Sequence, residues 1–186
     1  DYGLHLNIET MNKQLLSGWG ISSSHLYKGA VPYFPDFYEG SESQFAIESG
    51  SKTDTSDLTA FMKIQAMRGP AWWTEMGKIA DMKQMTLGWA VELYVGHWDG
   101  YPYNRNNYYI TFDETGYAHM MPWGVDQTWN GGMDYFGSGT LMFQRCQASE
   151  ACKEMYLQSM AEVSKIANSL RLDAMAFYVG VAIRQD

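Results

Sequence analysis

Two runs rich in aromatic and β-branched residues, 107–112 and 117–123, stand on either side of the tetrapeptide Asp-Glu-Thr-Gly. Asp and Gly are typical of tight turns, so this pattern predicts a β-hairpin. A hairpin brings the chain back to its starting point. The residues just before the first run and just after the second must therefore lie close together, which constrains the fold more than any other feature of the sequence.

The two segments that the hairpin joins are rich in polar side chains. Asp99 and Asn104 precede it, and Asp126 follows 126 − 99 = 27 positions after Asp99. Carboxylate and amide oxygens bind hard divalent cations. Asp followed five positions later by Asn is also the spacing of protein-kinase catalytic loops, with Trp98 here in place of the usual arginine. The sequence therefore predicts a metal–phosphate site at Asp99, Asn104 and Asp126.

Each of these residues has a structural alternative. Asp99 could form an Asx turn with the glycine that follows, Asn104 could cap turn amides like the neighbouring asparagines 106 and 107, and Asp126 could be a turn or helix-capping acid. His97 ends a helical pattern, where a histidine is expected to support terminal carbonyls. Core or domain-edge packing is expected, rather than sugar stacking, for tryptophans 72, 73, 89, 98 and 123.

Short strands and helices are expected in the rest of the chain. The expected strands are 2–9, 24–31 and 44–49, and the expected helices are 10–20 with Thr10 as N-cap, 55–67, 71–85, 86–96 and the tail from Ser149. Residues 32–56 and 124–139 are expected to be mainly loops. The expected fold class is α+β, with small antiparallel strands in the N-terminal part and a helical C-terminal part that carries the hairpin.

Length and composition limit the classes of protein. The 186 residues predict a single domain over 1–186, and the net charge of −8 argues against a nucleic-acid-binding face. No apolar run reaches the roughly 18 residues of a transmembrane helix, and no signal peptide is visible. Because the chain opens on an alternating strand pattern, we expect a truncated form with an upstream segment.

Cys146 and Cys152 are six positions apart. A disulfide between them would suit an exported protein, and two free buried thiols are the alternative. A zinc site is not expected because no second Cys/His pair lies nearby.

The segments "GLHLNIETMNKQLLSGWG", "HLYKG" and "HWDGYPYNRNNYYITFDETGYAHMMPWGVDQTW" together resemble the spore-coat protein H (CotH) family of kinase-like proteins, from about residue 2 to 130. The resemblance implies an atypical kinase-like fold. The implied activity is transfer of the ATP γ-phosphoryl group, with Mg²⁺ or Mn²⁺, to Ser or Thr of a coat or surface protein. It also implies an extracytoplasmic location, at a cell surface or spore coat.

By the same resemblance, Asp99 is expected to be the catalytic acid/base, and Asn104 and Asp126 the metal ligands. Lys28, in Leu-Tyr-Lys, is expected to contact phosphate with Glu9 as a possible partner. On sequence grounds alone Lys28 could equally be a solvated lysine at the end of a strand.

The chain departs from the family pattern in two places. Gly124 stands where the family usually carries its first aspartate of Trp-Asp-x-Asp, and no G-x-G-x-x-G loop occurs. One alternative function is therefore a non-catalytic surface, adhesion or pseudokinase domain of the same fold. Another is a carbohydrate-active module, which would need paired carboxylates across an aromatic cleft.

Overall fold

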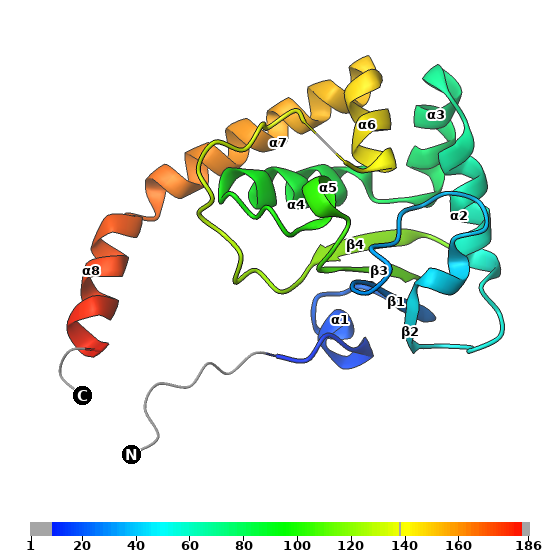
Figure 1. Cartoon of the computed structure of the whole chain (residues 1–186), viewed down its shortest axis with the longest axis horizontal. Coiled ribbons are helices and arrows are strands. Elements are labelled where there is room, and N and C mark those ends of the chain that lie inside the picture. The colour runs from blue at the N-terminus through cyan, green and yellow to red at the C-terminus, as the bar shows by residue number, and fades with distance from the viewer. Residues whose placement is uncertain (1–8, 138, 184–186) are drawn as a thin grey trace.

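Four short strands form one antiparallel sheet in the order β2-β1-β3-β4 (Figure 1). The computed structural model describes residues 9–137 and 139–183. The strands are β1 (His25–Gly29), β2 (Ala46–Ser49), β3 (Tyr108–Phe112) and β4 (Ala118–Pro122). The hairpin and the strands predicted at 24–31 and 44–49 are thus confirmed. The strand predicted at 2–9 lies outside the described residues except for Glu9.

The expected α+β class with small antiparallel strands is confirmed, and the N-terminal strands and the hairpin belong to the same sheet. β1 pairs with β3, where Lys28 lies opposite Tyr109, and β3 pairs with β4, where Tyr108 lies opposite Pro122. All five residues of β3 are buried. Buried backbone groups must be hydrogen-bonded, and a hairpin alone leaves one edge of β3 unpaired, so β1 completes its pairing.

The predicted helices are present with different ends, and three further helices, η1, α5 and α6, lie outside the predicted helical regions. The helices are α1 (Lys13–Gly18), the 3-10 helix η1 (Glu42–Gln44), α2 (Ser56–Ala66), α3 (Gly69–Ile79), α4 (Met82–Tyr94), α5 (Tyr101–Asn104), α6 (Leu141–Ala148), α7 (Glu150–Ser169) and α8 (Leu172–Ile183). Asn12 caps α1 through its side chain, so the expected cap Thr10 is wrong. The break between α3 and α4 falls at Asp81, because its side chain accepts a hydrogen bond from the Gln84 N–H and starts a new helix there.

The sheet separates two apolar clusters because successive strand residues face opposite sides. Tyr27, Ile110 and Phe112 belong to the main cluster, together with helical residues such as Trp89 and Leu93. A smaller cluster on the other face comprises Met11, Leu16, Leu26, Tyr109 and Met121. The larger helices therefore cover one face of the sheet, while α1 covers part of the other (Figure 1).

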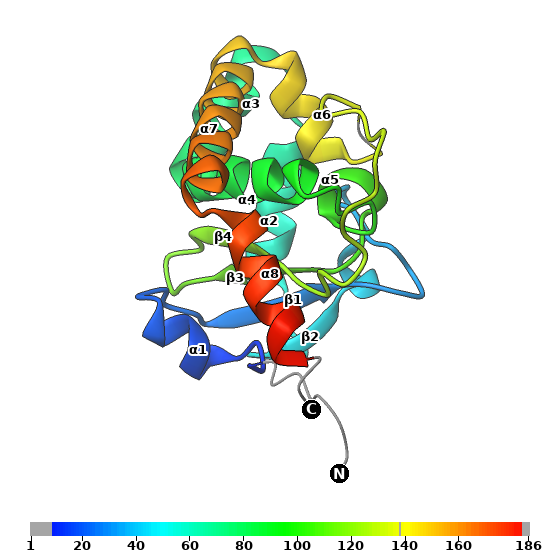
Figure 2. The ribbon, with the colours of Figure 1, turned by 90° about the vertical axis from the view of Figure 1, so that its left-hand side faces the viewer.

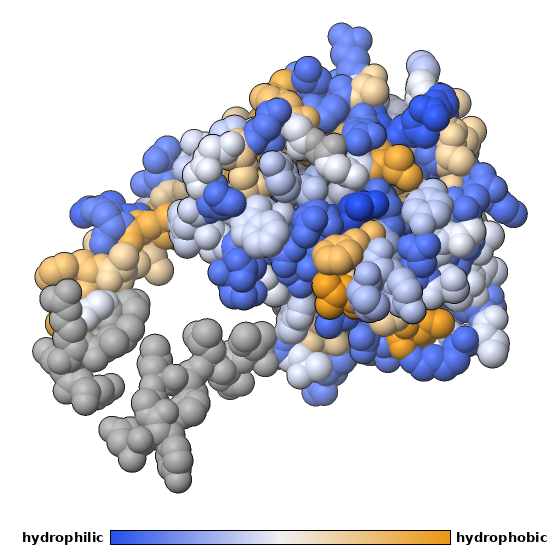
Figure 3. Space-filling view, viewed as in Figure 1, coloured by the Kyte–Doolittle hydropathy of each residue, from blue (hydrophilic) through white to orange (hydrophobic). Residues whose placement is uncertain are grey.

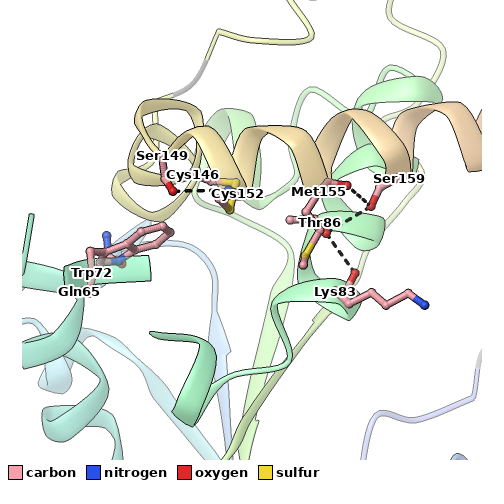
Figure 4. The surroundings of a disulfide bond; sticks show 9 residues. All are labelled: Gln65, Trp72, Lys83, Thr86, Cys146, Ser149, Cys152, Met155 and Ser159. Atoms are coloured by element: carbon pink, nitrogen blue, oxygen red, sulfur yellow. Dashed lines mark hydrogen bonds between the residues drawn. A yellow bond between two sulfur atoms is a disulfide. The ribbon is translucent and has the colours of Figure 1, made fainter. Parts of the chain in front are cut away.

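A disulfide joins Cys146 at the end of α6 to Cys152 in the first turn of α7 (Figure 4). The Ser149 side chain caps α7 by accepting a hydrogen bond from the Cys152 N–H. Further along, the Thr86 and Ser159 hydroxyls lie 3.2 Å apart and link α4 to α7. Helix α7, in the region predicted to be a helical tail, thus lies along α4 (Figure 2).

The C-terminal helix α8 extends from the end of α7 and carries exposed apolar side chains, including Met175, Phe177 and Tyr178. Hydrophobic residues are visible on the surface at this end of the molecule (Figure 3). Within the described residues, no helix has both the length and the apolar character that crossing a membrane requires. Trp72 and Trp89 are buried in the core, whereas Trp98 is 37% exposed and lies at the surface, so the tryptophans are divided between the two expected kinds of packing.

Candidate functional site

Helix α4 leads directly into the candidate site. The chain leaves the helix through a turn at Gly96, whose φ of 65° is in the left-handed region. A Cβ atom at this position would lie 2.6 Å from the Asn130 carbonyl oxygen. Only glycine therefore fits both the turn and the loop that packs against it.

A buried carboxylate supports the turn that carries Asp99. Glu92 on α4 is 3% exposed, and its Oε1 lies 3.0 Å from His97 Nδ1. The same carboxylate accepts a backbone hydrogen bond from Tyr101. Burial raises the pKa of Glu92, and the hydrogen bond from His97 acts in the opposite direction. Glu92 thus holds both ends of the 97–101 segment, and His97 supports the turn through this side chain rather than through terminal carbonyls.

Gly100 makes this arrangement possible. A Cβ atom at Gly100 would lie 2.1 Å from Glu92 Oε1 and 2.7 Å from His97 Nδ1. Any side chain here would displace the buried pair. The glycine after Asp99 is therefore required for packing, which its sequence context alone does not reveal.

Three asparagine side chains hold the Asp99 carboxylate. Asn104 donates from Nδ2 to Asp99 Oδ1 at 2.7 Å, while Asn106 and Asn107 donate to Oδ2 at 3.0 and 2.8 Å. A carboxylate offers about four acceptor positions, so one position is left for a hydroxyl donor. The predicted proximity of Asp99 and Asn104 is confirmed.

The Asx-turn alternative for Asp99 is wrong. Among the described residues, every group that donates a hydrogen bond to the Asp99 carboxylate is an asparagine side chain, and none is a backbone N–H. Turn capping was the expected role of Asn106 and the alternative for Asn107, but both side chains donate to the Asp99 carboxylate instead. In the sequence, the run Asn-Arg-Asn-Asn was the feature that could have indicated these contacts with Asp99. The backbone is left-handed at Arg105 and Asn107, with φ of 57° and 51°. This conformation turns the side-chain amides of Asn106 and Asn107 toward Asp99.

The loop that carries Asp126 begins beside this cluster. The Trp123 N–H donates to the Asn107 carbonyl at 2.7 Å. Gly124 has φ of 54°, and a Cβ atom there would lie 2.9 Å from Asn107 Oδ1. The Asn107 amide therefore occupies the space into which an acid at position 124 would extend.

Asp126 itself is exposed. None of the described residues forms a hydrogen bond or ion pair with its carboxylate. The hairpin thus brings the loop of Asp126 to the Asp99 cluster, as expected, but protein contacts do not fix the carboxylate.

Lys28 lies at the same end of the sheet. It is the penultimate residue of β1, next to Gly29, which is opposite Tyr108 at the start of β3. The Lys28 ammonium lies 5.7 Å from the centre of the Tyr109 ring, and that ring packs edge-on against Trp123 at 5.6 Å.

Glu9 is exposed and precedes α1. In the part of the chain that the structure describes, neither Lys28 nor Glu9 forms an ion pair.

A second buried acid fixes the far side of the site. Asp36 accepts hydrogen bonds from the Tyr101 hydroxyl at 3.0 Å and from the Leu141 N–H at 2.8 Å. Burial raises the pKa of Asp36. This contact ties α5 and the start of α6 to the loop that follows β1, so the Asp99 turn is held from two directions.

The candidate ligands for a cation at this site are mainly amide oxygens. Asn104 uses its amide nitrogen toward Asp99, and none of the described residues donates to its carbonyl oxygen. Asn106 Oδ1 is buried without a partner among the described atoms. No three His, Cys, Asp or Glu side chains within residues 9–137 and 139–183 converge on a common point. A cation here would therefore rely on amide oxygens together with the single carboxylate of Asp126.

Comparison with known proteins identifies the family. No curated protein shows significant similarity to the chain. The family model described as CotH kinase protein matches residues 1–170 of the 186-residue chain. The matched region contains every residue of the candidate site, so this chain belongs to the CotH kinase family.

Proposed function

We propose that this chain is a metal-dependent protein kinase domain that transfers the γ-phosphoryl group of ATP to a Ser or Thr hydroxyl of a protein. One observation carries this proposal: the Asp99 carboxylate is held by three amide groups on a turn that is fixed by a buried acid. Such rigid positioning of a carboxylate is what general-base catalysis of phosphoryl transfer requires.

Asp99 would accept the proton of the substrate hydroxyl through its remaining acceptor position. The hydroxyl oxygen forms a bond to the γ-phosphorus, the bond from that phosphorus to the β,γ-bridging oxygen breaks, and ADP leaves. Asn104 and Asp126 would hold Mg²⁺ or Mn²⁺, which when bound neutralises phosphate charge. Lys28 would contact a phosphate group, and Glu9 would be its partner.

Two further features agree with this assignment. The end of β1, the start of β3 and the end of β4 lie side by side at one end of the sheet, which places Lys28 at the same end as the loops of Asp99 and Asp126. The disulfide is consistent with an extracytoplasmic protein, and we propose a coat or surface protein as substrate.

The direct test is transfer of radiolabelled phosphate from ATP, with Mn²⁺, to a Ser/Thr-rich protein. We expect Asp99→Asn to lower kcat by about 10²- to 10⁴-fold, the contribution of a general base. The matched control is Glu114→Gln, an exposed acid in the turn at the opposite end of the hairpin, which should keep full activity. Equal labelling by wild type and Asp99→Asn would contradict the role of Asp99.

A specific observation favours a second candidate, a nucleotide-binding pseudokinase. Position 124 carries no acid, and the Asn107 amide fills the adjacent space. For this candidate we expect no labelling by any form of the protein, while ATP with Mn²⁺ still raises the melting temperature.

A further inference from the structure

Helix α8 stands apart from both apolar clusters of the described chain. Large apolar side chains are exposed along it and just before it, namely Leu170, Leu172, Met175, Phe177, Tyr178 and Val181. None of them belongs to either cluster, and none of the other described elements forms an extended contact with α8 (Figures 1 and 2). Because α8 also lies beyond residues 1–170, the region that the family model matches, the proposed kinase function does not explain it.

The helix has almost no polar face. Asp173 is the one charged residue of α8, and its carboxylate lies 3.6 Å from the guanidinium of Arg171, which directly precedes the helix. No residue from 174 to 183 carries a charge. A helix that is apolar around its whole circumference is normally buried against other protein. The uncovered side chains of α8 therefore indicate a partner surface.

The apolar patch has the size of a protein interface. Phe177 and Tyr178 are 68% and 72% exposed, and the other four side chains are between 39% and 54% exposed. At about 150–250 Å² for a large side chain, six such residues present roughly 500–800 Å². A stable interface buries about 600–1,000 Å² of each partner. Single surface apolar residues need no explanation, but a patch of this size marks an interaction site.

Gly180 is an independent sign of a close neighbour. It lies inside α8, where glycine is less favourable than every residue except proline. A Cβ atom at this position would meet no atom within 4 Å, so packing within this chain does not require glycine. Ala176 precedes Gly180 by four residues and therefore shares its helix face. Two small residues at this spacing allow a second helix to approach closely.

Charge and length decide between the possible partners. A helix that lies on a lipid surface usually carries Lys or Arg on a polar face, whereas α8 has neither and the chain has a net charge of −8. Its 12 residues rise about 18 Å, less than the roughly 30 Å of a bilayer core. A second copy of the same helix would cover the patch without desolvating a charge, and a two-fold axis brings identical patches together.

We propose that α8 is a dimerisation helix that packs against α8 of a second copy of this chain, with the two helices closest at Gly180. Figure 1 shows α8 beyond the end of α7 and away from the sheet, which leaves room for the second copy. The proposal does not depend on the proposed kinase function.

Sedimentation equilibrium of the purified chain tests this proposal. The wild type should form a concentration-dependent dimer with twice the 21.2 kDa mass of the chain. Phe177→Asp should raise the dissociation constant at least about 100-fold, because the symmetry of the dimer buries the new carboxylate twice. The matched control is Trp19→Asp, which places the same charge at a 55% exposed aromatic residue outside α8 and should leave the dimer intact.

Gly180→Leu separates pairing of the helices from their folding. Leucine favours a helix more than glycine does, so the helix content measured by circular dichroism should not fall. The new side chain should nevertheless hold the two helices apart and raise the dissociation constant about tenfold. The matched control is Gly77→Leu on α3, another exposed position where a Cβ atom meets nothing within 4 Å, and this variant should dimerise like the wild type.

A wild-type chain that stays monomeric at every concentration would overturn the proposal, and so would a dimer that Phe177→Asp leaves unchanged. Binding of a monomeric wild type to vesicles of phosphatidylcholine would also overturn it and would assign α8 to a lipid surface. Loss of the dimer in Phe177→Asp and Gly180→Leu, with both control variants dimeric, would support it.

Discussion

The two acids of the candidate site are held in very different ways. Asp99 accepts hydrogen bonds from three asparagine side chains, on a turn fixed by the buried Glu92, whereas Asp126 is exposed and without a partner among the described residues. The fold therefore builds one half of the site in advance. The other half would gain its geometry only from a bound cation, which would offset the loss of side-chain freedom.

The largest effect in this comparison should come from Gly100→Ala. The new methyl group would overlap Glu92 Oε1 and separate it from His97, so we expect the free energy of unfolding to fall by about 3 kcal/mol. Urea denaturation measures this change. Gly88→Ala on α4, the helix that carries Glu92, meets no atom within 4 Å and should instead stabilise by about 0.5–1 kcal/mol. Similar destabilisation by both substitutions would refute the buried support.

The next effect separates the two acids directly. Asn107→Ala removes a hydrogen bond to a carboxylate and should cost about 2 kcal/mol in urea denaturation. Asp126→Ala removes no protein contact among the described residues and should change stability by less than about 0.5 kcal/mol. If the two variants were destabilised equally, Asp126 would have a structural partner that its exposure does not indicate.

A smaller effect tests the contact between Gly124, in the loop of Asp126, and Asn107, which holds Asp99. Gly124→Ala should cost about 1–2 kcal/mol, because it combines a left-handed backbone with a Cβ atom 2.9 Å from Asn107 Oδ1. In a double-mutant cycle with Asn107→Ala, the double variant should lose about 0.5 kcal/mol less than the sum of the single losses. Strict additivity would show that Asn107 does not restrict position 124.

The last effect is a dependence on pH. Burial raises the pKa of Glu92 above its ordinary value of 4.5, so the unfolded chain releases this proton first as the pH rises. The stability of the wild type relative to Glu92→Gln should therefore fall from about pH 4.5 up to the raised pKa, with a slope of at most about 1.4 kcal/mol per pH unit, and then stay constant. Urea denaturation of the two proteins over a series of pH values tests this prediction. If the stability of the wild type relative to Glu92→Gln rose with pH, the pKa of Glu92 would be lowered in the folded protein, and the prediction would be wrong.

The regular patterns of the sequence predicted much of the fold. The Asp-Glu-Thr-Gly turn gave the hairpin, and the helical pattern before His97 gave α4 and the position of the Asp99 turn. The prediction of a helix start failed where two possible N-cap residues lie close together in the sequence. Thr10 and Asn12 are both good N-caps, and in the structure the Asn12 side chain accepts the capping hydrogen bond. The pairing of β1 with β3 joins residues about 80 apart, which no local pattern encodes.

The candidate site divides along the same line. By itself, the sequence predicted which side chains would carry chemistry and, through the hairpin, that the loops of Asp99 and Asp126 adjoin. Only the tertiary structure decided that Asn106 and Asn107 face Asp99, that Glu92 supports the turn, and that Asn107 fills the space beside Gly124. The physical reason is that side-chain partners depend on backbone conformation and on long-range packing, whereas the sequence fixes only residue types and spacing.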